Sequence, residues 1–185
     1  SSTGALVTTQ SSLLRLRSFT PTQAPPVFSE IRTDREYLEI VNPSNAEWDL
    51  GGWEIQLLSA DFGPTLLPAA RLRFPSHSIL PSGGVVTWTS EGVAPGVFPN
   101  LVHPSSFLKK AAYTLARLFD SQGHIVDELQ FVAPSSNVRE SPWKGSRLVL
   151  GIPSASNSMH RRGYANHFRA EDWFPAPHSP KTLHS

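Results

Sequence analysis

Cysteine is absent from the 185 residues, which excludes both a disulfide framework and a metal site built on thiolates. Long apolar runs are also missing, because no segment approaches the roughly 20 residues needed to span a bilayer. The N-terminal residues lack the basic start and apolar stretch of a secretory signal. We therefore expect an intracellular protein without membrane insertion. The initial Ser1 indicates a fragment or a processed product of a longer chain.

Apolar residues are fewer, and prolines more numerous, than in a typical globular chain, at 39% and 17 residues respectively. A chain of this length buries one core of ordinary size rather than two large ones. We therefore expect a single folded domain over residues 27–133. An irregular N-terminal extension is expected over residues 1–26 and an irregular C-terminal extension over residues 134–185.

Charge is unevenly divided among these three parts. Residues 27–133 hold 7 Lys and Arg against 12 Asp and Glu, whereas residues 134–185 hold 7 against 3. Residues 1–26 contribute Arg15 and Arg17 and no acidic residue. An acidic body with basic ends predicts that the ends are attracted to acidic surfaces.

The central part of the chain alternates apolar and polar residues with a period of two, which predicts strands of a half-buried antiparallel sheet. Leu38 and Ile40, for example, share one face, while Tyr37, Glu39 and Val41 share the other. No helical periodicity competes with this pattern, and proline-bearing corners separate the segments, which is typical of a β-sandwich or barrel. The predicted strands lie within 35–42, 53–58, 71–74, 83–90 and the two halves of a hairpin over 113–131, which turns at 120–123.

The dipeptide Gly51–Gly52 stands directly before Trp53. In a phosphate-binding loop the glycines lead into a helix, whereas here they lead into a predicted strand. We therefore expect a tight corner that only glycine can make and that places Trp53 in the core.

Three segments in succession, over residues 37–58, 71–92 and 113–129, resemble the lamin tail domain, the immunoglobulin-like module at the C-terminal end of nuclear lamins. The resemblance implies an all-β, immunoglobulin-like antiparallel β-sandwich over roughly residues 27–131. It rests on a strand ending in Asn and a polar turn, a Gly-Trp corner, a Phe-Pro step, a Gly-Val-Val strand and a hairpin turning on Gly. These elements are Asn42, Gly52–Trp53, Phe74–Pro75, Gly84–Val86 and Gly123.

Other features depart from the lamins themselves. Residues 1–26 contain no heptads of a coiled-coil rod, the chain ends without a cysteine for prenylation, and no basic cluster signals nuclear import. The sequence thus resembles a lamin-tail-domain-containing protein rather than a lamin. The resemblance implies a cytoskeletal or cytoplasmic location, including the cilium, or a nuclear one.

Reactive groups are sparse and scattered. The histidines, including His160 and His167, have no acidic partners at metal-ligand spacing and are interpreted as surface-loop residues. His124 and Asp127 flank the predicted hairpin turn, where we expect both to be exposed to solvent. No nucleophile-elbow sequence is found. We therefore expect no enzyme activity, no metal and no cofactor.

Near the C-terminus, Glu171 and Asp172 resemble a carboxylate pair for sugar hydrolysis. The favoured interpretation is instead that Trp173 and Phe174 dock the extension onto the domain. Aromatic and basic side chains alternate through this extension, a pattern suited to an acidic protein surface or to nucleic acid. The alternative is that the extension wraps its own acidic domain. The candidate partner-binding residues are Trp143, Lys144, Arg147, Arg161, Arg162, Tyr164, Phe168, Arg169 and Trp173.

The sequence therefore favours a non-catalytic structural protein that attaches to a filament or large assembly with an acidic surface. By resemblance, the partner is the nuclear lamina or a cytoskeletal or axonemal polymer such as a microtubule, with nucleic acid less favoured. The alternative is a carbohydrate-binding β-sandwich, in which exposed members among Trp48, Trp88 and Trp143 stack on sugar rings.

Overall fold

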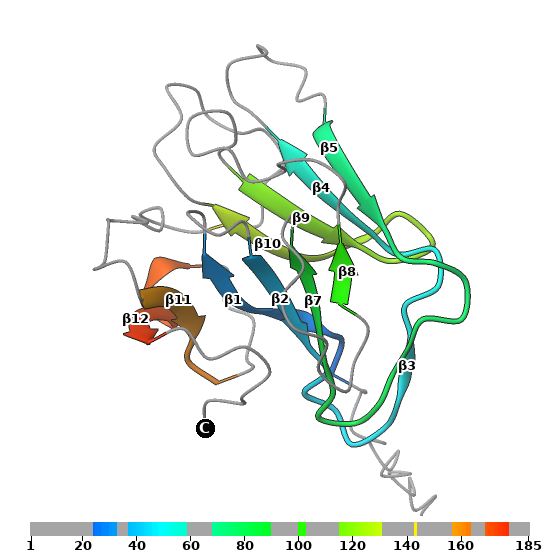
Figure 1. The fold of residues 1–185 in the computed structure, drawn as a ribbon, viewed down its shortest axis with the longest axis horizontal. Helices are drawn as coiled ribbons and strands as arrows, with labels where there is room; N and C mark the ends of the chain where they lie inside the picture. Colours follow the sequence, from blue (N-terminus) through cyan, green and yellow to red (C-terminus); the bar gives the residue numbers. More distant parts are fainter. Residues whose placement is uncertain are drawn as a thin grey trace, which may run out of the picture.

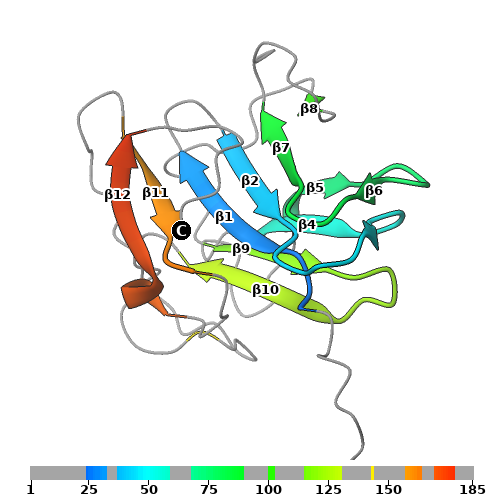
Figure 2. The ribbon, with the colours of Figure 1, turned by 90° about the horizontal axis from the view of Figure 1, so that it is seen from below.

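The structure is a computed structural model that describes residues 24–32, 37–58, 68–89, 100–102, 115–130, 143, 157–163 and 169–177. Regular structure within these residues is β, apart from one 3-10 turn, η2 (Ala170–Asp172). Most strands belong to two sheets that face each other in two layers (Figures 1 and 2). This arrangement is the expected immunoglobulin-like β-sandwich.

The larger sheet has six strands in the order β12-β11-β1-β2-β7-β8. Neighbours pair antiparallel, except that β8 runs parallel to β7. At the margin formed by β12, Pro175 and Pro177 lie opposite Met159 and Asn157 of β11. The strands are β1 (Val27–Arg32), β2 (Tyr37–Val41), β7 (Val85–Thr89), β8 (Asn100–Val102), β11 (Asn157–Arg161) and β12 (Trp173–Pro177).

The second sheet has four antiparallel strands in the order β10-β9-β4-β5. A separate short pair, β3 (Trp48–Asp49) with β6 (Ile79–Leu80), lies on the side of the molecule away from β12 (Figure 2). The strands of the second sheet are β4 (Glu54–Leu58), β5 (Pro68–Arg73), β9 (Leu115–Phe119) and β10 (Ile125–Gln130).

One apolar core fills the space between the two sheets. Leu38 and Ile40 of β2 face Ile55 and Leu57 of β4, and all four side chains belong to one buried cluster. On the other face of β2, the Tyr37 hydroxyl donates to Glu39 Oε2 at 2.7 Å. The period of two therefore assigned both faces correctly, because strand side chains alternate across the sheet. The expected half-burial is wrong for β2, since all five of its residues are buried.

The Gly51–Gly52 corner has the expected geometry. Gly52 adopts φ +79°, a left-handed conformation that L side chains rarely tolerate. The Trp53 N–H donates to the Leu50 carbonyl at 2.9 Å, closing the turn. Trp53 is only 4% exposed, and its ring packs edge to face on Trp48 with the ring centres 5.7 Å apart.

The predicted hairpin is confirmed as β9 and β10, with their turn at Asp120–Gly123. Asp120 Oδ1 accepts the backbone N–H groups of Gln122 and His124 at 2.9 and 2.8 Å. Gly123 supplies the positive φ, +84°, that the turn requires.

Two stretches inside residues 134–185 are strands, so the expectation of an irregular extension is wrong there. β11 pairs with β1, and β12 pairs with β11, which adds two strands to the larger sheet. Met159 and Trp173 from these strands enter the main core cluster. The docking expected of Trp173 is thereby confirmed. We refer below to residues 157–163 and 169–177 as the C-terminal ribbon.

Candidate functional site

The candidate partner-binding residues do not form one surface. Arg161 and Trp173 are buried, Trp143 is half-buried against the core, and Arg162 and Arg169 are exposed. Burial therefore removes Arg161 and Trp173 from the set that a partner can contact on the folded domain. The other four candidates, Lys144, Arg147, Tyr164 and Phe168, lie outside the described residues.

Arg161 is directed into the domain, where it forms a buried ion pair with Asp127 of β10. Arg161 Nη2 lies 3.0 and 2.8 Å from the two carboxylate oxygens of Asp127. The Arg161 side chain is 2% exposed and that of Asp127 is fully buried. The Arg161 guanidinium also lies 5.1 Å from the ring centre of Trp173. The ion pair therefore links the C-terminal ribbon to the opposite sheet.

Asp127 contradicts the expectation that it is exposed near the hairpin turn. His124 is exposed as expected, with 78% of its side chain accessible, but Asp127 lies beyond an irregularity in β10 between Ile125 and Asp127. Beyond this irregularity, Asp127 points to the same face as Leu129, two residues later, and Leu129 belongs to the core. A sequence period read from the turn alone does not show this shift.

Burial raises the pKa of the Asp127 carboxyl, because desolvation penalises its charged form. Three contacts oppose this effect: the Arg161 charge, the Phe28 N–H at 2.8 Å and the Glu128 N–H at 2.8 Å. Asp127 thus receives contacts from β1, β10 and β11 at once. These contacts hold β1, β10 and β11 together. Among them, no group is positioned to act on a substrate.

A second buried polar cluster lies on the outer face of the larger sheet, around Glu30 of β1. The Ser158 hydroxyl donates to Glu30 Oε1 and lies 3.1 Å from His160 Nε2. His160 Nε2 also lies 3.6 Å from Glu30 Oε1 and 3.1 Å from the Pro177 carbonyl. The expectation of a surface-loop histidine is wrong for His160, which is 1% exposed within β11.

Ser158, His160 and Glu30 have the composition of a serine-hydrolase triad but not its geometry. In a triad, one imidazole nitrogen faces the serine and the other faces the acid. Here the same nitrogen, Nε2, faces serine, carboxylate and a backbone carbonyl. The imidazole therefore does not bridge the serine and the acid. The cluster instead joins β1 to the C-terminal ribbon.

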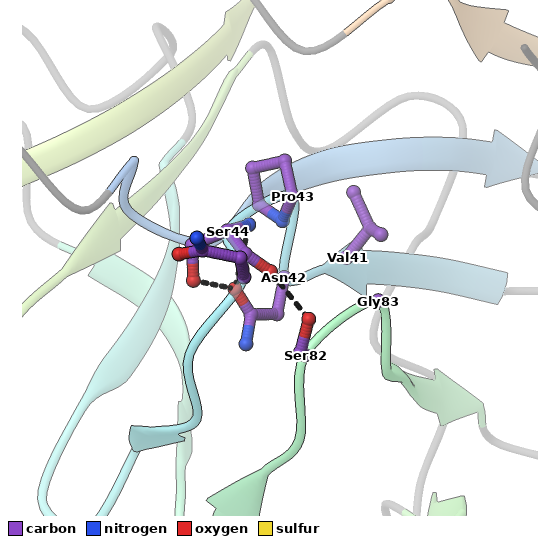
Figure 3. A pocket seen from close by; sticks show the side chains of 7 residues that line it. Val41, Asn42, Pro43, Ser44, Ser82 and Gly83 are labelled. Carbon is purple, nitrogen blue, oxygen red and sulfur yellow. Dashed lines mark hydrogen bonds between the residues drawn. The ribbon is translucent and has the colours of Figure 1, made fainter. Parts of the chain in front are cut away.

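A shallow hollow of about 300 Å³ lies beside the turn that follows β2 (Figure 3). The Asn42 amide donates to the carbonyls of Ala46, Leu80 and Pro81, at 2.8, 3.1 and 2.9 Å. Its oxygen accepts the backbone N–H of Ser44 at 3.0 Å. The hydrogen-bonding capacity of Asn42 is thus used to hold the turn. The hollow is lined by Val41, Asn42, Pro43, Ser44, Asn45, Ser82 and Gly83.

Tryptophans do not provide a sugar-stacking platform among the described residues. Trp88 is 7% exposed, and its ring centre lies 5.8 Å from that of Phe74. Trp48 and Trp143 are half-buried and pack against the core. The alternative of a carbohydrate-binding module therefore loses its expected contact surface.

The part of the chain that the structure describes likewise contains neither a metal-binding cluster nor a catalytic pair of carboxylates. No group of three or more potential metal ligands occurs among these residues. Glu171 and Asp172, the carboxylates suggested as a pair near the C-terminus, have different surroundings. Asp172 forms an ion pair with Arg169 at 3.6 Å, whereas Glu171 is exposed.

Comparison with protein families gives one decisive match: the Lamin Tail Domain model covers residues 20–133, more than half of the chain. The chain belongs to the lamin tail domain family. Its membership confirms the resemblance drawn from the sequence and implies a role in protein interaction. No curated protein matches the chain significantly.

The C-terminal ribbon lies outside the segment matched to the lamin tail domain, yet it continues the sheet of that domain. The match ends at residue 133, whereas β11 begins at Asn157. Sequence reasoning found the docking of Trp173 but missed the burial of Arg161, Ser158 and His160. It also missed their partners Asp127 and Glu30. The only signal was the alternation of Ser158 and His160 with Met159 and Arg161.

Two of the arginines predicted from the sequence are exposed in this lamin tail domain protein, Arg162 just after β11 and Arg169 just before η2. The Arg162 guanidinium lies 5.2 Å from the ring centre of Phe174. Arg169 is 49% exposed beside Asp172. None of the described helical structure is long and apolar enough to cross a membrane.

Proposed function

We propose that this chain is a non-catalytic lamin-tail module that attaches to a filament or large assembly with an acidic surface. The family suggests two kinds of partner with an acidic surface. One is the nuclear lamina, and the other is a cytoskeletal or axonemal polymer such as a microtubule. The corresponding location is the nucleus, or the cytoskeleton including the cilium.

The observation that carries this proposal is that Arg162 and Arg169 of the C-terminal ribbon are both exposed. Arg162 stacks near Phe174, which restricts the guanidinium and lowers the entropy lost on binding. The ribbon itself is fixed by the buried Asp127–Arg161 pair. The two exposed cations therefore lie next to strands that pair with each other within the larger sheet.

Buried ionisable groups support a non-catalytic role. Glu30 and Asp127 engage hydroxyl, guanidinium or backbone donors inside the fold. Catalytic acids and bases must instead reach a substrate. The groups left accessible at the ribbon include Arg162 and Arg169, cations suited to pairing with carboxylates, beside the exposed Glu171.

Co-sedimentation with assembled lamins and with microtubules tests the proposal. The variant Arg162→Ser/Arg169→Ser should bind several-fold more weakly than wild type, and the difference should shrink at high salt because exposed charges are screened. Arg162→Lys/Arg169→Lys is the matched control, since it keeps both charges. Equal binding of the serine variant and wild type would contradict the proposal. Deletion of residues 134–185 is a poor test, because it removes Met159 and Trp173 from the core.

A further inference from the structure

Strand β5 forms one margin of the four-stranded sheet (Figure 1). Among the described residues, β4 is the only strand with which β5 pairs. A margin strand has backbone donors and acceptors that its single neighbour does not use, and these can pair with a strand from another chain.

The hydrogen bonds next to this strand show which backbone groups face outward. The Phe74 N–H donates to the Trp53 carbonyl at 2.9 Å, so Phe74 faces β4. Because backbone direction alternates along a strand, Leu72 also faces β4, opposite Ile55. The N–H and C=O groups of Arg71 and Arg73 therefore point away from β4, toward the side of β5 that has no paired strand among the described residues.

The side chains of the same two residues carry an excess of positive charge. Arg71 Nη1 and Arg73 Nη2 lie 3.1 and 3.0 Å from the two oxygens of Glu54. The arginine side chains are 56% and 70% exposed, whereas that of Glu54 is 8% exposed. One buried carboxylate thus orients two guanidinium groups whose outer donors remain accessible.

The positive charge of Arg71 and Arg73 indicates which kind of strand can pair with β5. A second copy that pairs antiparallel through its own β5 places arginines against arginines, and like charges across strands are destabilising. An extended segment with Asp or Glu at alternate positions satisfies both the outward backbone groups and the outer guanidinium donors. Nucleic acid satisfies only the guanidinium groups.

We propose that the β5 margin is a docking site for an extended acidic segment of a protein partner, which adds to the sheet as a strand and pairs with Arg71 and Arg73. The proposal builds on the proposed attachment to an acidic partner and assigns that attachment a second contact. It uses a surface separate from Arg162 and Arg169.

Three labelled peptides test this site on the unaltered chain. The first is a capped peptide that alternates Glu with Val. The other two have the same sequence but are N-methylated at alternate residues, one along each edge. Each keeps its charge but cannot pair along its methylated edge. Fluorescence anisotropy should show that methylation on the pairing edge weakens binding by about tenfold or more. Amide hydrogen exchange should slow at Arg71 and Arg73 when the unmethylated peptide is present.

Arg71→Ser/Arg73→Ser should lose most of the peptide binding, while Arg162→Ser/Arg169→Ser, a matched pair of exposed arginines, should retain it. The triple variant that also carries Glu54→Gln avoids leaving a buried carboxylate unpaired, and it should bind the peptide as weakly as the double variant. Equal affinity for peptides methylated on either edge and for the unmethylated peptide, or unchanged amide exchange, would overturn the proposal. So would displacement of the peptide by a DNA duplex that binds more tightly and leaves amide exchange unaltered.

The polymer experiment separates this proposal from the proposed function. Loss of co-sedimentation in the Arg162/Arg169 variant, with no strand pairing at β5, rejects the docking site alone. Specific peptide docking at β5, with no sedimentation on either polymer, rejects the proposed polymers and keeps the docking site.

Discussion

Substitution of Arg161 by methionine is expected to destabilise the domain more than any change at an exposed arginine. Both members of the Asp127–Arg161 pair are almost completely buried, so removal of the guanidinium leaves a carboxylate that water cannot solvate. Breaking a buried pair in this way costs about 3–5 kcal/mol. Against a total stability of roughly 5–15 kcal/mol for a domain, this loss is severe.

The stability of Arg161→Met should also change with pH, in a direction set by the pKa of Asp127. Burial already raises the pKa of Asp127, and loss of the Arg161 charge raises it further. An acid with a higher pKa in the folded state stabilises folding most below its unfolded pKa, and this stabilisation is lost as pH rises through the folded pKa. The free energy of unfolding of Arg161→Met should therefore fall as the pH rises above the ordinary Asp pKa of about 4, more steeply than that of wild type.

Urea denaturation followed by tryptophan fluorescence at several pH values measures both effects. Arg162→Met is the matched control, because Arg162 is the next residue and is exposed. The double variant Asp127→Asn/Arg161→Met should recover part of the loss, since the amide keeps an acceptor for one backbone N–H without a charge. If Arg161→Met unfolds like Arg162→Met at pH 7 and has the same pH slope as wild type, the assigned role of the pair is wrong.

Three further outcomes can be measured. Trp53→Ala should lower the unfolding free energy by about 3–5 kcal/mol, because it empties a core position, and a melting temperature within a degree or two of wild type would contradict this. Gly52→Ala should cost about 1–2 kcal/mol from its left-handed backbone conformation alone, since the added Cβ lies at an ordinary 3.6 Å from Ser121; calorimetry tests this value. The pKa of Asp120 should be measured by NMR below 3.8: burial acts to raise it, but hydrogen bonds from His124 and Gln122 outweigh burial.

The strands and the Gly51–Gly52 corner were predictable because their signals are local. Alternation along β2 and β4 shows the apolar face directly, and the turn at Asp120–Gly123 has its own residue chemistry. No contact with a distant residue is needed to interpret either signal. These elements account for much of the sandwich.

The C-terminal ribbon was not predictable in the same way. In β11, Arg161 occupies an inward position that a sequence pattern assigns to solvent. Its burial is explained only by Asp127, which lies 34 residues earlier in the chain. An ion pair between residues so far apart produces no periodic pattern in the sequence. The residues of the ribbon were therefore interpreted as an irregular extension.

The prolines of β12 set a limit on how this molecule can assemble. The Arg162 N–H donates to the Asp172 carbonyl, so by alternation Phe174 faces β11 while Pro175 and Pro177 face outward. Proline has no N–H to offer a neighbouring strand. The margin of the larger sheet at β12 therefore lacks two of the donors that a further strand would use, which disfavours the stacking of copies of the chain into a continuous β-fibre across that side.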